Sequence, residues 1–139
     1  MPFLGRLFRR HFWATIRMFA TNKSVMASPA MARDMFLSAD TEIDVQEFHG
    51  KLVAESMSVA VELSFLIKSK PEQVVSPTFV IAAENDACFS VGEQQRLAKA
   101  LNARYELLPG IAHNIMIEPK WRETADMIDT WITQDLGLP

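Results

Sequence analysis

The spacing of hydrophobic residues changes near residue 77 and divides the sequence into two halves. Before this point, apolar side chains recur every three or four positions, which is typical of amphipathic helices. Beyond it, two short apolar runs are separated by a helical segment, as in a parallel sheet with a crossover helix. The sequence therefore predicts an α/β protein with a helical region over residues 1–70 and a βαβα unit over residues 71–139.

Residues 3–19 have the pattern of a basic amphipathic helix. Apolar side chains fall on one broad arc, and arginines gather on the opposite side. The arginines are Arg6, Arg9, Arg10 and Arg17. We expect this helix to lie over a neighbouring apolar surface. A membrane-surface segment or an organelle-targeting peptide has the same Arg-rich, acid-poor composition.

Three further helices are indicated in the first half. Ser28 is a typical N-cap residue, and the fixed φ of Pro29 suits the first position of a helix that runs to about residue 37. Asp44 caps the next helix, and Glu47 completes a capping-box-like pair. The last of the three covers residues 57–67.

The second half begins with TFVIAA at residues 78–83, a run that predicts a strand buried on both faces. A capping box of Ser90 and Glu93 then opens a helix, and ARYELL at residues 103–108 predicts a second, parallel strand. The final helix covers residues 119–134, and Gly137 is placed to stop it. The side chains that this helix is expected to bury are Trp121, Ala125, Ile128 and Ile132.

Composition and charge narrow the class of protein. A net charge of -3 and a pI of about 5.6 argue against a nucleic-acid-binding domain, which usually carries a basic excess. Cys88, the single cysteine, cannot form an internal disulfide and is typical of a reducing compartment. No apolar run approaches the ~20 residues that cross a bilayer. We therefore expect a soluble, cytoplasmic protein.

Two residues with catalytic chemistry directly follow the two predicted strands. Asp86 lies in the loop after the first strand, and His113 lies in the loop after the second. Because the carboxyl ends of parallel strands open into the same crevice, we expect these two side chains to meet. A carboxylate beside an imidazole fixes its tautomer and stabilises the imidazolium that forms when the histidine removes a proton.

These loops resemble the carboxyl-terminal half of an α/β-hydrolase of the serine esterase and lipase type. AENDACF is similar to the acid loop G-x-x-D-x-x-[VF], and LPGIAHNIMIEPKW is similar to the histidine loop L-P-G-x-G-H-x-x-x-x-[DE]-x-x-W. Residues 20–70 resemble the lid of monoacylglycerol-lipase-like members. The resemblance implies that Asp86 is the triad acid and His113 the general base. Ala83 and Ala112 stand where glycine is usual, as small-for-small changes.

The sequence departs from this family at the nucleophile, because it contains no G-x-S-x-G elbow. We therefore expect a truncated or split hydrolase whose parent reaction is hydrolysis of an apolar acyl ester. An amino-terminal half would carry the serine, and the chain alone is expected to be catalytically silent.

Three alternatives remain. The chain could form a homo-oligomer that covers the exposed sheet, or it could be a non-catalytic interaction or membrane-surface module that uses residues 3–19. The sequence could also be one part of a longer reading frame.

Other polar residues are given structural roles. Ser90 is interpreted as a helix cap and Cys88 as a small packed side chain, rather than as nucleophiles. The three histidines, His11, His49 and His113, are too scattered for metal-ligand spacing. The sequence therefore predicts neither a metal site nor a cofactor.

Overall fold

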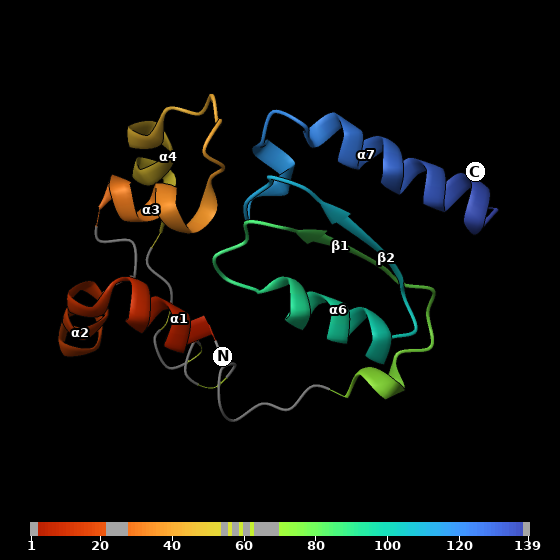
Figure 1. The fold of residues 1–139 in the computed structure, drawn as a ribbon, viewed down its shortest axis with the longest axis horizontal. Coiled ribbons are helices and arrows are strands. Elements are labelled where there is room, and N and C mark those ends of the chain that lie inside the picture. Colours follow the sequence, from red (N-terminus) through yellow and green to blue (C-terminus); the bar gives the residue numbers. More distant parts are fainter. Residues whose placement is uncertain are drawn as a thin grey trace.

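A computed structural model describes residues 3–21, 28–53, 56, 59, 62 and 70–137. Over these residues the chain has mixed α/β structure, with helices and a two-stranded parallel sheet (Figure 1). The helix predicted for residues 57–67 lies outside the described residues, apart from two positions. Among the described residues, no helix is both long and apolar enough to cross a membrane.

The sheet and its crossover helix agree with the sequence prediction. Strand β1 (Phe79–Ala83) pairs in parallel with β2 (Arg104–Leu108), and helix α6 (Val91–Ala100) connects them. The register places Ala83 opposite Leu108. Both strands therefore end at the same edge of the sheet, and the two loops that follow them leave from neighbouring points.

Burial of β1 is less complete than predicted. Ala82 and Ala83 are buried, but the first three residues of the strand are only partly buried. Helix α6 packs against both strands, while the helical segment at the end of the chain lies on the other side of the sheet (Figure 1). That segment contacts the strand through Trp131, whose ring centroid lies 5.5 Å from that of Phe79. Because the described sheet has only two strands, it gives little surface for a second covering helix.

The final helix forms as predicted, but it does not bury the expected residues. Helix α7 (Trp121–Thr130) continues into the π-helical turn η4 (Trp131–Asp135), and Gly137 follows with φ +64°. Thr124 is the buried residue of α7. Of the four side chains expected to be buried, three are exposed and Ile132 is half-buried; the exposed ones are Trp121, Ala125 and Ile128. The predicted face would need a wider sheet to cover it.

The helix predicted over residues 3–19 is divided into α1 (Phe3–Arg10) and α2 (Phe12–Thr21). The break coincides with an ion-pair cluster: the Asp34 carboxylate accepts from Arg10 at 2.9 Å and from His11 Nε2 at 2.7 Å. These bonds attach the junction to the neighbouring helix. The predicted apolar arc is covered only in part, because Leu7 is fully buried whereas Phe8, Phe12 and Ile16 are exposed.

Two capped helices complete the helical region. Helix α3 (Pro29–Phe36) begins at Ser28, whose hydroxyl accepts from the Met31 backbone N–H at 3.2 Å. Helix α4 (Val45–Lys51) begins at Asp44, whose carboxylate accepts from the Glu47 backbone N–H at 2.8 Å. Both predicted N-caps are confirmed. A core cluster joins α1 and α3 to the loop after β1, and it consists of Leu7, Met31, Met35, Ala87 and Cys88.

Candidate functional site

The loop after β1, residues 84–90, is called the acid loop here, and Asp86 organises it. Asp86 Oδ1 accepts from the backbone N–H groups of Cys88 at 2.6 Å and Phe89 at 3.0 Å. An aspartate that bonds to the backbone two and three residues ahead is a common way to fix a turn. The carboxylate is only 7% exposed. Its second oxygen, Oδ2, is held toward the neighbouring loop.

Helix α6 fixes the two ends of the acid loop. The Gln94 side chain donates to the carbonyls of Ala83 at 3.1 Å and Phe89 at 3.0 Å, and it accepts from the Ala83 backbone N–H at 3.1 Å. The Glu93 carboxylate accepts from the Ser90 backbone N–H at 2.9 Å and from its hydroxyl at 2.6 Å. Ser90 therefore serves as the helix cap that the sequence predicts.

Arg6 of α1 links the acid loop to the helical region. Its guanidinium donates to the Glu93 carboxylate at 2.5 Å and also to the backbone carbonyl of Cys88. Burial acts to raise the pKa of Glu93, but hydrogen bonds from Ser90 and the charge and hydrogen bond of Arg6 outweigh it and lower the pKa to about 2. The sequence pattern predicts Arg6 on the side of the helix opposite the apolar arc, and the structure places its side chain inside the fold, at 17% exposure.

The loop after β2, residues 109–118, is called the histidine loop here, and it begins at a sharp turn. Gly110 has φ +75°, a conformation that favours glycine. Its backbone N–H donates to Glu84 at 2.8 Å, and the Asn85 N–H donates to the Ile111 carbonyl at 2.9 Å. These two bonds hold the histidine loop beside the acid loop.

Residues 36–38, at the end of α3 and just beyond it, bond to the backbone on both sides of His113. The Asn114 N–H donates to the Phe36 carbonyl at 3.1 Å, and the Ala112 N–H donates to the Ser38 hydroxyl at 2.9 Å. The Ser38 N–H in turn donates to Glu118 at 2.7 Å, and Ser38 and Glu118 are both buried. These contacts were not predicted from the sequence. The acidic position of the histidine-loop motif was the available signal for Glu118, whereas no local pattern marks Ser38.

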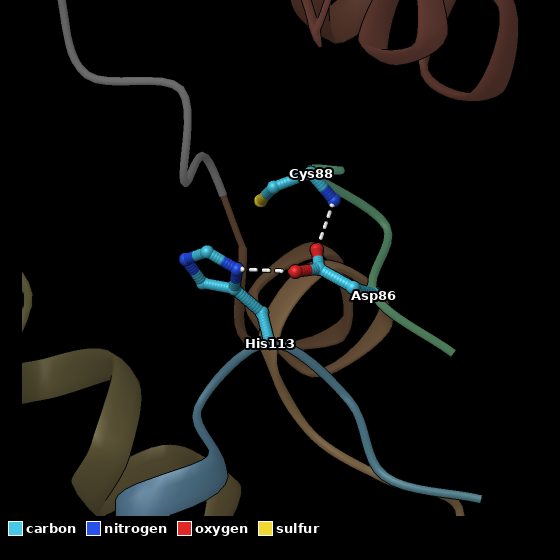
Figure 2. Close-up of side chains that lie close together, drawn as sticks. All are labelled: Asp86, Cys88 and His113. Atoms are coloured by element: carbon cyan, nitrogen blue, oxygen red, sulfur yellow. Dashed lines mark hydrogen bonds and ion pairs between the residues drawn. The ribbon is translucent and has the colours of Figure 1, made fainter. Parts of the chain in front are cut away.

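The two loops bring the predicted pair together. His113 Nδ1 lies 3.0 Å from Asp86 Oδ2, and Figure 2 shows the imidazole and the carboxylate facing one another, with the second ring nitrogen directed away. The rings of Phe36 and Phe89 lie 5.6 and 5.9 Å from the imidazole. The expected meeting of the two side chains is confirmed, while their catalytic role stays a prediction.

The surroundings of His113 favour its charged form. Hydrogen bonds to the Asp86 carboxylate and to the Cys88 side chain raise its pKa from 6.5 to about 10, against the opposing effect of burial. At neutral pH the imidazole is therefore in its charged form, with a proton on both ring nitrogens. It can donate one of these protons, but it must lose one before it can act as a base.

Cys88 is the third member of the cluster. It is buried, as predicted, but its Sγ also lies within 4.8 Å of an Asp86 oxygen and of a His113 ring nitrogen. Aspartate, cysteine and histidine are all ligands that zinc uses. However, Asp86 already accepts from two backbone N–H groups and faces the imidazole through its other oxygen. A metal would have to replace these bonds, so the donor set fits an acid–base pair better.

Comparisons of the chain with protein-family models, curated proteins and solved structures gave no match. The resemblance to α/β-hydrolases therefore stays a prediction from the sequence.

Proposed function

We propose that this chain supplies the acid–base half of a serine-dependent hydrolase that acts on apolar acyl esters. The observation that carries the proposal is the 3.0 Å contact between Asp86 and His113, at the carboxyl ends of adjacent parallel strands. This is where catalytic groups of open α/β sheets gather. The serine belongs to a separate amino-terminal half, because the sequence contains no G-x-S-x-G elbow.

In the assembled site, Asp86 and His113 have separate roles. Asp86 accepts from Nδ1–H and holds the imidazole in one tautomer. The second ring nitrogen, which points away from Asp86, takes the serine proton as the hydroxyl attacks the ester carbonyl. The same nitrogen then returns the proton to the alcohol that leaves. Backbone donors from the other half would stabilise the oxyanion.

The missing serine elbow supports catalytic silence of the chain alone. Removing the nucleophile and the oxyanion donors eliminates most of the transition-state stabilisation in a hydrolase of this kind. The acid–base pair is then in place with nothing to activate.

Apolar surface that remains exposed supports the proposal that this chain binds a partner. The described sheet has only two strands, so both strands have an open outer edge. Leu107 of β2 and Val75, just before β1, remain 37% and 95% exposed. An amino-terminal half that contributes further strands would cover this surface, and a second copy of the chain is the alternative cover.

Hydrolysis of p-nitrophenyl acetate and of a long-chain p-nitrophenyl ester tests the proposal. The assay is run with the chain alone and with an α/β-hydrolase fragment that ends before its lid. We expect no activity above background from the chain alone, and activity from the mixture that Asp86→Asn and His113→Ala each reduce. Activity of the isolated chain that both substitutions abolish would contradict silence. Activity of the mixture that neither substitution changes would contradict the assigned roles.

One exposed cluster favours a second candidate, a non-catalytic membrane-surface module. Phe8, Phe12 and Trp13 on α1 and α2 are 43%, 42% and 78% exposed. Their rings contact one another at 4.7 and 5.1 Å, and Arg9 is exposed on the same helix as Phe8. Exposed aromatic rings beside arginine suit the interface of an anionic bilayer. Two of the four arginines, Arg6 and Arg10, are already bound to carboxylates, which weakens this candidate.

Co-sedimentation with anionic and with neutral vesicles tests the second candidate. A surface module would bind anionic vesicles at low salt and release them at high salt, because surface charges are screened within ~8 Å at physiological ionic strength. Trp13→Ala would reduce binding, whereas Trp121→Ala, at a partly exposed tryptophan on α7, would not. Equal sedimentation with both vesicle types would exclude this function.

A further inference from the structure

Three arginines of α1 border a pocket to which neither proposed function assigns a ligand. Arg6, Arg9 and Arg10 are three and four positions apart, so they share one face of the helix. The pocket has a volume of about 300 Å³, and the acid loop closes its other side with Asp86 and Ser90. The structure thus places a basic helix face against a small space.

The carboxylates around this pocket are already balanced by donors. Asp86 of the acid loop has a donor on each of its oxygens. Glu93 of α6 pairs with Arg6 at 2.5 Å, and Asp34 of α3 pairs with Arg10 at 2.9 Å. Each of these carboxylates is therefore compensated, and little negative charge is left to repel an anion.

Arg9 carries the charge of this helix face that is left over. In the part of the chain that the structure describes, its guanidinium has no ion-pair partner, and the residue is exposed. Met35, which is buried in the core, lines the same pocket. An apolar wall lowers the local dielectric and strengthens the attraction between a guanidinium and an anion. The pocket therefore has positive charge that its neighbouring carboxylates do not neutralise.

We propose that this pocket binds a phosphate group, with Arg9 as its main ligand and Arg10 as the second. A guanidinium has five N–H donors, and the pair with Asp34 uses donors on Nε and Nη2 of Arg10, so others remain for a second anion. A phosphate presents enough oxygens for two guanidinium groups at once, whereas one guanidinium fills a carboxylate. Two sources provide this group: a soluble phosphate ester, and the headgroup of an anionic lipid whose acyl chains would lie on the exposed Phe8.

Titration with inorganic phosphate, followed by amide NMR of the intact chain, tests the pocket. Sodium chloride is reduced as phosphate is added, so that the ionic strength stays constant. We expect saturable shifts of the amide signals of α1 and the acid loop. Arg9→Gln should raise the Kd at least about tenfold, because charge-assisted hydrogen bonds are lost. Arg10→Gln should also raise it, because Asp34 then faces the pocket without its partner.

A matched control separates a built pocket from general surface attraction. Arg122→Gln removes the same charge from an exposed position on α7, outside the pocket. Because exposed charges at a distance are screened, this variant should change the Kd by less than about twofold. Equal weakening by Arg9→Gln and Arg122→Gln would overturn the proposal, as would phosphate binding that Arg9→Gln leaves unchanged.

Vesicles of phosphatidylcholine, with and without phosphatidic acid, distinguish the two sources of the phosphate. A lipid-headgroup site predicts binding to the vesicles with phosphatidic acid, reduced by Arg9→Gln, and little binding of inorganic phosphate. A site for a soluble phosphate predicts the reverse. Either result supports the pocket, and the absence of both kinds of binding would overturn it. The ester assay with the complementing half is independent, so its failure would leave this inference standing.

Discussion

The acid loop and the histidine loop contribute one residue each to the site, but they are held in different ways. Most of the bonds that shape the acid loop come from within about a dozen residues, namely from Asp86 itself and from Gln94 of α6, and Arg6 adds one distant bond to the Cys88 carbonyl. Apart from its bonds to the acid loop, the histidine loop depends on Ser38 and Phe36, which are more than seventy positions away in the sequence.

This difference shows how the pair is assembled. The acid loop carries its own turn and can take its shape once α6 has formed. The histidine loop needs the segment after α3 to be docked before His113 is fixed. The helical region is therefore part of the framework of the site, rather than only a cover over it.

Removing Glu118 should cause the largest loss. Glu118→Ala leaves the buried Ser38 N–H without its acceptor and opens a cavity, and we expect a loss of about 3 kcal/mol in the free energy of unfolding. Glu118→Gln, the matched control, keeps an oxygen at the same place and should lose much less. Urea unfolding of both variants gives the measurement. Equal losses would show that the acceptor at this position does not fix the loop.

Gln94→Ala tests the locally held loop in the same way. The substitution removes the acceptor of the Ala83 backbone N–H and the shorter of two bonds to its carbonyl; because Ala83 is buried, the change should cost about 2 kcal/mol. Gln95→Ala, at an exposed glutamine on the same helix, is the control and should cost less than about 0.5 kcal/mol. In the Gln94 variant we expect the amide NMR signals of the histidine loop to shift less than those of the acid loop. The reverse order would contradict the comparison.

The contact between the loops should make stability depend on pH. The pKa of His113 is raised in the folded chain from 6.5 to about 10, so its contribution is complete below about pH 6.5 and is lost as the pH rises through about 10. We expect a loss of roughly 2 kcal/mol after allowance for solvent screening of a side chain that is 31% exposed. His113→Ala should remove this dependence in urea unfolding. A wild-type curve that stays flat over this range would count against the ion pair.

Ser38→Ala should have the smallest effect of the substitutions that change the histidine loop. It deletes the acceptor of the Ala112 N–H but keeps the Ser38 backbone bond to Glu118, so we expect a loss of about 1 kcal/mol. Ser76→Ala, at an exposed serine before β1, should be neutral. Hydrogen exchange of Ala112 gives a second measurement and should accelerate only in the Ser38 variant.

The sequence predicted the elements whose causes are local. The strands, α6, the N-caps at Ser28 and Asp44 and the meeting of Asp86 with His113 all follow from short patterns or from parallel-sheet geometry. Contacts between distant residues were missed. Arg6 was expected on an open face because helical periodicity does not show that Glu93 lies opposite it. The prediction of which α7 side chains are buried was wrong, because the sequence pattern assumes a wider sheet than the described residues form.

The pKa of His113 tests the central claim most directly, and NMR titration of its imidazole in the folded chain measures it. The account predicts that the wild-type imidazole titrates near 10 and that Asp86→Asn lowers its pKa toward 6.5, because the main hydrogen-bond partner loses its charge. An imidazole that titrates near 6.5 in both proteins would contradict the claim that the two strand-end loops form one functional pair.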